Sequence, residues 1–178
     1  MPKKLIKFIT QEEFEKVFDA VNKVNGTSIE RKKQYKLALL LGFESGMRIS
    51  EIVGYKDIVP ELTKDMIEVA SIRIEQGKGQ KDRIVPRPKR MNEKAIKMLP
   101  LNIKRRALQD FTTKLCKNIL NKELTFHSFR HGFGSHLAGQ GRPLHEIQML
   151  MGHSRLDTTG IYLHANPKEA IDGARDVF

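Results

Sequence analysis

The sequence predicts a mainly α-helical domain with one small antiparallel β-sheet, an α+β fold. Over most of the chain, apolar residues recur every three or four positions, which is the period of an amphipathic helix. Between positions 66 and 86 the pattern changes to two short apolar runs around Gly77-Lys78-Gly79, which is typical of a β-hairpin. The length of 178 residues is sufficient for one domain with a buried core.

Helices are expected over 11–24, 29–45 and 49–54 in the N-terminal third. The first begins at a capping box, because Thr10 and Glu13 have the spacing of an N-cap residue and its reciprocal partner. Ser28 caps the second helix and Gly46 ends it. Its second half is apolar nearly all round and should be buried. The short third helix directly follows Arg48.

The hairpin follows these helices. Ile72 and Ile74 precede its turn, Val85 follows it, and Pro86 ends the second strand. Lys78 should lie at or near the tip of the turn.

Helical periodicity returns after the hairpin, with helices expected over 91–99, 103–121 and 127–139, then from Pro143, and over the tail 166–178, whereas the short segment 157–163 carries Tyr162. Proline suits a first helical turn, where its missing N–H is not needed. Ile147, Leu150 and Met151 should face inward, and Cys116 fits a small core position.

Composition narrows the class of protein. The 32 Lys and Arg residues exceed the 21 Asp and Glu residues, giving a formal net charge of +11 that favours a polyanionic partner such as nucleic acid. A well-solvated lysine-rich surface is the plainer interpretation. No apolar run is long enough for a membrane span. The single cysteine excludes an intrachain disulfide and fits a cytoplasmic protein.

Neither a metal nor a cofactor is expected. The six histidines form no His-Glu-x-x-His motif, and there are no paired cysteines. His127 and His131 have metal-compatible spacing, but no carboxylate lies in the adjacent motif. Gly77-x-Gly79 lacks the other residues of a nucleotide-binding loop.

Arg48 is the first candidate phosphate ligand. A guanidinium donates two parallel hydrogen bonds to a phosphate and stays charged. Gly46 lets the backbone turn just before it, and Glu51 lies one helical turn later, where it could orient the arginine. An ordinary surface arginine with an i, i+3 ion pair is the alternative.

His127 and Arg130 are the second candidate group. They are three positions apart and should project from one helix face toward the same phosphate. His131 points roughly 100° away and could support them. A capped helix carrying solvated polar residues would show the same spacing.

Three further residues complete a possible reaction. Lys78 could protonate a leaving oxygen, with Lys81 as a competitor, or simply contact phosphate. His153 follows the helix-ending Gly152 and could hydrogen-bond a phosphate oxygen. Tyr162 could attack phosphorus if cations or a base lower its pKa from about 10. In isolation these residues fit a polar turn, a cap histidine and a half-buried tyrosine.

The order and spacing of these motifs are more specific than any one of them. The chain resembles the tyrosine recombinase (phage integrase) family, and most of all its Xer-like and archaeal branch. The resemblance covers nearly the whole chain through Gly46-Met47-Arg48-Ile49-Ser50-Glu51, Gly77-Lys78-Gly79-x-Lys81-x-Arg83-x-Val85-Pro86, His127-x-x-Arg130-His131, Leu150-Met151-Gly152-His153-Ser154 and Thr158-Thr159-x-Ile161-Tyr162.

The resemblance implies a role for each residue in metal-independent DNA cleavage and rejoining. Arg48 and Arg130 would clamp the scissile phosphate, and Tyr162 would form a 3′-phosphotyrosyl link. Lys78 would be the general acid, although the long 54–66 segment leaves Lys81 as an alternative. The remaining implied roles are acid–base residue and phosphate ligand for His127, hydrogen-bond donor for His153, support for Glu51 and His131, and DNA contacts for Lys81, Arg83, Ser128 and Arg155.

The resemblance also implies a domain arrangement and partners. Residues 1–178 would form one catalytic domain, without the N-terminal core-binding domain of typical members. Double-stranded DNA would be the partner, with self-association on it as in the family's tetramers, and the tail 166–178 could pack on a neighbouring subunit. Two other functions remain open: a type IB-like topoisomerase activity and a non-catalytic DNA-binding protein.

Overall fold

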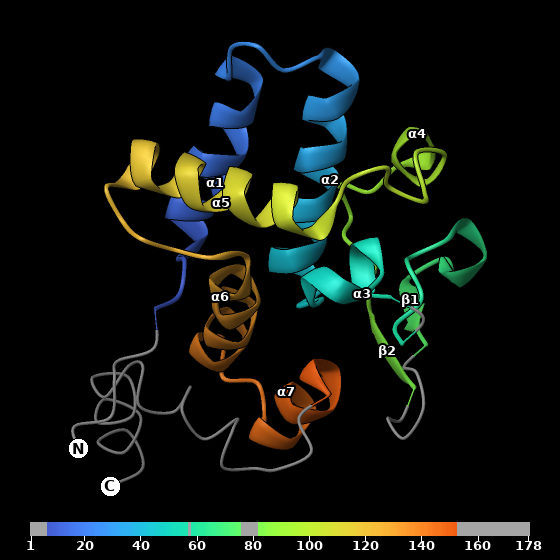
Figure 1. Cartoon of the computed structure of the whole chain (residues 1–178). Coiled ribbons are helices and arrows are strands. Elements are labelled where there is room, and N and C mark those ends of the chain that lie inside the picture. The colour runs from blue at the N-terminus through green and yellow to red at the C-terminus, as the bar shows by residue number, and fades with distance from the viewer. Residues whose placement is uncertain (1–6, 57, 76–81, 153–178) are drawn as a thin grey trace, which may run out of the picture.

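Helices account for more than half of the residues that the structure describes, and two strands among them form one sheet (Figure 1). This computed structural model describes residues 7–56, 58–75 and 82–152. The α-helices are α1 Gln11–Ala20, α2 Ile29–Glu44, α3 Ile49–Val53, α4 Glu93–Ile96, α5 Arg105–Leu120, α6 Phe126–Gly139 and α7 Leu144–Met151. Two 3-10 turns, η1 Val21–Lys23 and η2 Lys64–Met66, and the strands β1 Ser71–Ile74 and β2 Arg83–Pro86 complete the described elements.

The main core lies where α1, α2, α5 and α6 meet. Helices α1 and α2 run side by side, α5 crosses them, and α6 packs against the second half of α2 (Figure 1). Phe14 and Phe43 stack with ring centroids 4.2 Å apart, and Phe129 meets Phe14 edge-on. Every residue of α2 from 37 to 43 is buried, which confirms the expectation for its apolar second half. Cys116 is also buried, as predicted.

The predicted helix starts at Thr10 and Ser28 are confirmed. The Thr10 side chain accepts a hydrogen bond from the Glu13 backbone at 3.2 Å, and the Glu13 carboxylate accepts one from the Thr10 backbone at 3.2 Å. The Ser28 hydroxyl accepts from the Arg31 backbone at 3.2 Å. These caps satisfy N–H groups that have no partner inside the helix.

The β-hairpin is confirmed as an antiparallel pair in which Ile72 lies opposite Val85 and Ile74 opposite Arg83. Ile72, Ile74 and Val85 are buried, whereas Ile84 is exposed. Because side chains alternate along a strand, Arg83 faces the same side as Val85 and is buried with it. The turn of the hairpin, including Lys78, lies outside the described residues.

Two helix boundaries differ from expectation. The helix expected over 91–99 is only α4, because the Asn92 side chain caps it by accepting from the Ala95 backbone at 3.0 Å. Pro100 also disfavours a helical conformation in the residue before it. Pro143 is the N-cap of α7 rather than its first helical residue. The segments 157–163 and 166–178 lie outside the described residues.

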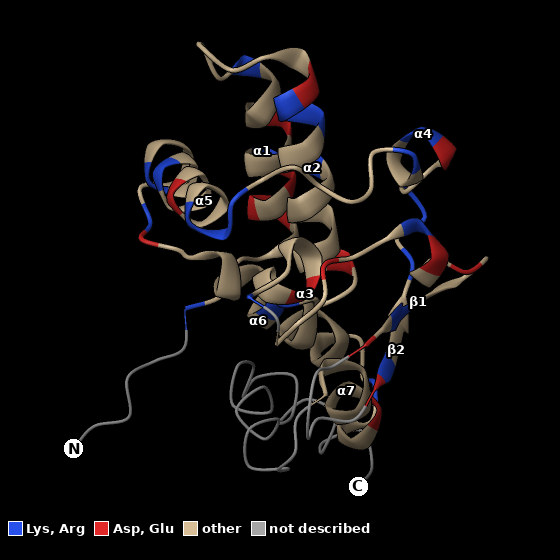
Figure 2. Ribbon diagram, turned by 45° about the vertical axis from the view of Figure 1, so that its right-hand side comes forward, with Lys and Arg blue, Asp and Glu red and all other residues tan. Residues whose placement is uncertain are grey.

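Positive and negative side chains are interspersed along the helices and strands (Figure 2). Basic positions recur on α5 and along the sheet, and acidic positions cluster on α1. Across the described ranges, no helix combines the length and the apolar character needed to cross a bilayer.

Candidate functional site

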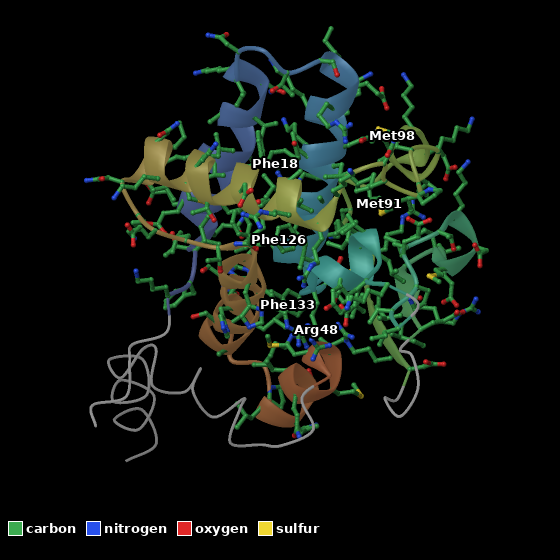
Figure 3. The ribbon with its side chains drawn as sticks, in the orientation of Figure 1. Phe18, Arg48, Met91, Met98, Phe126 and Phe133 are labelled. Atoms are coloured by element: carbon green, nitrogen blue, oxygen red, sulfur yellow. The ribbon has the colours of Figure 1, made fainter. Side chains whose placement is uncertain are left out.

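Arg48 and Arg130 both reach the end of α7, although they are far apart in the sequence. Arg130 donates from one terminal nitrogen to the Gly46 carbonyl and from the other to the Met151 carbonyl. Arg48 donates from Nη2 to the Gly152 carbonyl at 3.2 Å. The two guanidinium groups therefore join three segments: the α2–α3 junction, α6 and the C-terminal end of α7. In Figure 3, Arg48 lies between α3 and α7.

The α2–α3 junction turns sharply to present Arg48 at the start of α3. Gly46 has a φ of +63°, a conformation that favours glycine. A Cβ atom at this position would collide with the ring of Phe133, which belongs to α6. The turn buries Met47 and leaves Arg48 as the residue before the first turn of α3. Glycine is needed here for both its backbone angle and its small size.

Glu51 holds Arg48 in place. The Arg48 side chain donates from Nη1 to Glu51 Oε1 at 2.8 Å, and the Arg48 backbone N–H donates to Oε2 at 2.7 Å. The exposed fraction of the side chain is 32% for Arg48 but only 3% for Glu51. The pair predicted from spacing is present, but its carboxylate is buried rather than on the surface.

Arg83 was predicted to contact DNA, but it is buried and forms a fork with the same carboxylate. Its Nη1 and Nη2 donate to the two Glu51 oxygens at 2.6 and 2.9 Å, and its side chain is 6% exposed. In this structure the guanidinium of Arg83 binds a protein carboxylate, and its contact with DNA stays a prediction. Side chains alternate along a strand, so Arg83 shares a face with the apolar Val85, and this pattern could have predicted the burial of Arg83.

Ser128 was also predicted to contact DNA, but its residue is 5% exposed. Its hydroxyl accepts a hydrogen bond from the Thr125 backbone N–H at 3.2 Å. Ser128 therefore caps α6, because it lies three residues after the N-cap, where a polar side chain returns to the backbone. Its contact with DNA stays a prediction.

Two arginines lower the pKa of Glu51. Burial opposes its ionisation and raises the pKa, but the hydrogen bonds and charge of Arg83, together with Arg48, outweigh burial and bring the pKa from 4.5 to about 2. Glu51 is therefore ionised at neutral pH. It contributes stability above pH 4.5 that is lost as the pH falls toward 2.

Replacing Glu51 with glutamine is expected to lower the free energy of unfolding by about 3–5 kcal/mol at pH 7, because Arg83 would lose its buried counter-charge. Urea unfolding of both proteins measures this difference, which should shrink between pH 4.5 and pH 2 as the wild-type carboxylate becomes protonated.

Glu15→Gln is the matched control, since Glu15 pairs with the partly exposed Arg90 at 2.9 Å. That change should cost about 0–1 kcal/mol. Equal losses in the two variants would contradict a special role for the buried carboxylate.

His127 and His131 form a contacting pair on α6. Their ring centroids are 4.4 Å apart with the rings nearly perpendicular. His131 was expected to point away from this site. It lies one helical turn after His127, so the two rings meet.

Both histidines are held in their neutral form near pH 7. The protein packed around the His127 ring, followed by the charges of Arg130 and Arg48, lowers the pKa of His127 below 6.5. Burial, then His127 and Arg130, lowers the pKa of His131 to about 4. Because the charges of both Arg130 and Arg48 lower the pKa of His127, both arginines lie close enough to act on its ring electrostatically. A neutral imidazole there can accept a proton.

The remaining predicted site residues lie outside the described residues. Lys78 and Lys81 fall within 76–81, and His153, Arg155 and Tyr162 fall within 153–178. Their predicted roles stay predictions. Sequence reasoning also missed the carbonyl groups of Gly46, Met151 and Gly152, which hold the two arginines and have no side-chain signature.

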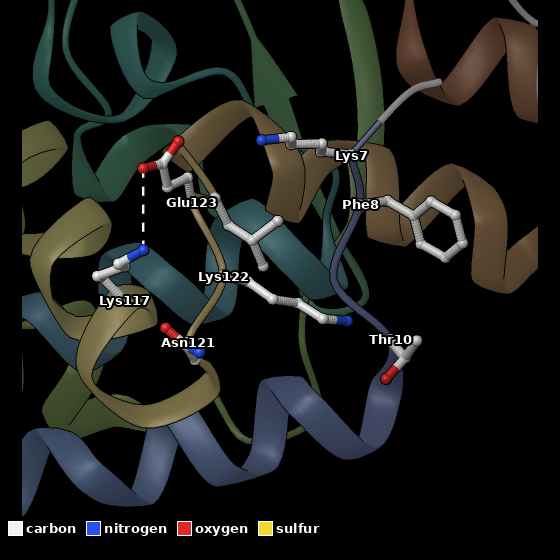
Figure 4. Close-up of a pocket in the computed structure, with 8 residues that line it drawn as sticks. Lys7, Phe8, Thr10, Lys117, Asn121, Lys122 and Glu123 are labelled. Carbon is white, nitrogen blue, oxygen red and sulfur yellow. Dashed lines mark ion pairs between the residues drawn. The ribbon is translucent and has the colours of Figure 1, made fainter. Parts of the chain in front are cut away.

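A separate hollow of about 520 Å³ lies between the N-terminal segment and the end of α5 (Figure 4). It is lined by Lys7, Phe8, Thr10, Lys117, Asn121, Lys122, Glu123 and Leu124. None of the predicted site residues that the structure describes lines it. Within the described part of the chain, no group of three or more His, Cys, Asp or Glu side chains is arranged to hold a metal ion.

The arrangement around Arg48 suits a phosphate group. Two guanidinium groups supply positive charge and directed donors, and a neutral imidazole beside them can exchange a proton. Both arginines are fixed by the backbone of other elements, so their donors are oriented before a ligand arrives.

The chain is similar in sequence to a known protein family. Residues 98–169 match the phage integrase family. The tyrosine recombinase XerC of Thermodesulfovibrio yellowstonii is 32% identical over 193 residues, covering 94% of this chain and 61% of the relative. The chain spans about three fifths of the length of the curated relatives it matches.

Solved structures show the same fold. A XerA recombinase crystal structure matches with a TM-score of 0.71 at 20% identity, covering 98% of this chain and 66% of that one. A XerH site-specific recombinase, bound to its palindromic difH substrate after cleavage, matches with a TM-score of 0.68 at 24% identity, covering 98% and 54%.

Proposed function

Because the chain belongs to the phage integrase family of tyrosine recombinases, we propose that it cleaves and rejoins DNA strands through a 3′-phosphotyrosyl intermediate. The observation that carries this proposal is the convergence of Arg48, Arg130 and His127 from two helices that are distant in the sequence. Such a group can neutralise a phosphodiester while it is attacked.

The reaction would proceed by transfer of one phosphorus atom between two oxygens. The Tyr162 phenol attacks the scissile phosphorus, the bond to the 5′-oxygen breaks, and a 3′-phosphotyrosyl bond forms. His127, neutral near pH 7, accepts the phenolic proton. Lys78 or Lys81 gives a proton to the departing 5′-oxygen. Arg48, Arg130 and His153 hold the non-bridging oxygens.

Rejoining reverses these steps. A 5′-hydroxyl attacks the phosphotyrosyl phosphorus and releases Tyr162. The energy of the phosphodiester is retained in the covalent link, so the exchange of strands needs no nucleotide cofactor.

We also propose double-stranded DNA as the partner. The net charge of +11 favours a polyanion, and the similar XerH recombinase was crystallised on its difH substrate. Self-association on DNA, with exchange of the tail 166–178, is a further part of the proposal. A chain that relaxes supercoils or binds DNA without cutting it is less favoured, since the similar proteins are named recombinases.

A nicked suicide duplex tests the proposal. Cleavage near the nick releases a short fragment by diffusion and traps the covalent complex, so a protein–DNA adduct should persist in denaturing gel electrophoresis. Incubation with supercoiled plasmids carrying the same candidate sites then separates recombinant junctions, expected here, from relaxed circles. Retarded DNA in native gels without any adduct would contradict strand cleavage.

A further inference from the structure

Arg83 makes a set of contacts that the proposed reaction does not use. It is the first residue of β2, directly after the hairpin turn. Its Nη1 and Nη2 donate to the Glu51 carboxylate at 2.6 and 2.9 Å, and its Nε donates to the Leu150 carbonyl at 3.0 Å. All three guanidinium nitrogens therefore bind α3 or α7, and the side chain is withdrawn from solvent.

Arg83 binds the Glu51 carboxylate, which is also the group that orients Arg48. Glu51 Oε1 accepts from both Arg48 Nη1 and Arg83 Nη1, and Oε2 accepts from the Arg48 backbone and Arg83 Nη2. Rotation of Glu51 would break contacts to both arginines. Arg83 thus restricts Arg48 through the carboxylate that the two arginines share.

The sharing also changes the charge that Arg48 presents. An isolated Arg48–Glu51 pair would be neutral and would attract a phosphate weakly. With Arg83, two guanidinium groups share one carboxylate, so one positive charge remains uncompensated in the trio. Arg83 and Glu51 are 6% and 3% exposed, whereas Arg48 is 32% exposed and opens to solvent. The excess charge can therefore act at Arg48.

Arg83 also supports the end of α7. The αL residue Gly152, with a φ of +59°, lies against the Arg83 stem so closely that an added Cβ would be 2.7 Å from Arg83 Cδ. The Gly152 carbonyl is the group that accepts from Arg48 Nη2 at 3.2 Å. Both anchors of the Arg48 guanidinium, Glu51 and Gly152, are thus in contact with Arg83.

We propose that Arg83 is a positioning residue, which ties β2 to α3 and α7 so that Arg48 keeps its orientation and a net positive charge toward phosphate. The inference deepens the proposed function, because it concerns the same phosphate site. It makes a prediction that the proposed function does not make. Removing the Glu51 carboxylate should partly restore phosphate binding and DNA cleavage in a protein that has lost Arg83.

Inorganic phosphate is the probe for the first test. The rise in melting temperature in phosphate, relative to chloride at equal ionic strength, is measured for wild type and for Arg48→Ala, and the difference isolates the contribution of Arg48. Arg83→Met should abolish that contribution, because the unbalanced Glu51 carboxylate then neutralises Arg48. Arg83→Met with Glu51→Gln should regain part of it.

The matched control is Arg90→Met. Arg90 also binds carboxylates, but these are Glu15 and Glu44 and not the Glu51 that binds Arg48. That variant should keep the wild-type response to phosphate. Arg83→Lys retains a charge but not the fork, so its response should fall between wild type and Arg83→Met.

Cleavage of the nicked duplex is the second test, measured in single turnover at a temperature where every variant is folded. Arg83→Met should cleave about 100-fold more slowly, as expected for misplacement of a reacting group's neighbour, and the double variant should cleave faster than Arg83→Met alone.

The inference is overturned if the phosphate response does not depend on Arg48 or survives in Arg83→Met, or if the double variant is no better than the single one. A wild-type protein that forms no adduct but shows the Arg83-dependent phosphate response would instead sink the proposed function and leave the positioning role standing.

Discussion

Tyr162→Phe is expected to abolish the covalent DNA adduct while leaving DNA affinity within about twofold of wild type, since it removes one neutral hydroxyl and no phosphate-contacting cation. The substitution deletes the only atom proposed to bond to phosphorus. Denaturing gels of the suicide duplex measure the adduct, and native gels at fixed salt measure affinity.

The chain offers two matched controls in Tyr35 and Tyr55. Tyr35 stacks on Phe111 with ring centroids 3.7 Å apart, and the Tyr55 ring lies under the Arg105 guanidinium at 4.6 Å. Phenylalanine at either position should leave adduct formation intact. An adduct that persisted in Tyr162→Phe and vanished in Tyr55→Phe would assign the nucleophile to a different part of the chain.

Arg130→Ala is expected to slow cleavage by about 100- to 1000-fold, because the transition state loses a fixed donor to its developing charge. The residue is 1% exposed and its side chain binds the Gly46 and Met151 carbonyls, so the substitution also removes a support of the site. Single-turnover cleavage of the suicide duplex measures the rate, and circular dichroism checks that the variant is folded.

Arg130→Lys separates charge from geometry. Lysine keeps the positive charge but cannot span the two carbonyls with a planar fork, so this variant should also be slow while staying closer to wild type in stability. Arg142→Ala is the control. The Arg142 side chain is 63% exposed and forms a loose surface pair in which Nη1 lies 3.9 Å from Glu146 Oε2. Cleavage at the wild-type rate in folded Arg130→Ala would remove Arg130 from the phosphate clamp.

Local features of the fold could be predicted from the sequence because their causes are local. The caps at Thr10 and Ser28 depend on residues three positions apart, and the hairpin follows from two apolar runs around a glycine-rich turn. The pairing of Arg48 with Glu51 was predictable for the same reason, since one helical turn separates them.

Features that depend on tertiary packing were missed. Arg83 was predicted only as a DNA contact, and its binding to a carboxylate supplied by α3 was not foreseen, because the strand register that turns it inward depends on packing. Ser128 was assigned to DNA, but its position in the first turn of α6 directs its hydroxyl to the backbone. The carbonyl groups that hold Arg48 and Arg130 come from a chain reversal at Gly46 and from the end of α7, and no side-chain motif encodes them.

The central claim is that Arg48 and Arg130 act on one phosphate. A crystal structure of the Tyr162→Phe variant bound to an uncleaved duplex would measure it directly, through the distances from both guanidinium groups to the non-bridging oxygens of each phosphate. The account predicts that both arginines lie about 2.7–2.9 Å from oxygens of the same scissile phosphate. Guanidinium groups bound to different phosphates, or Arg130 remote from every phosphate, would contradict it.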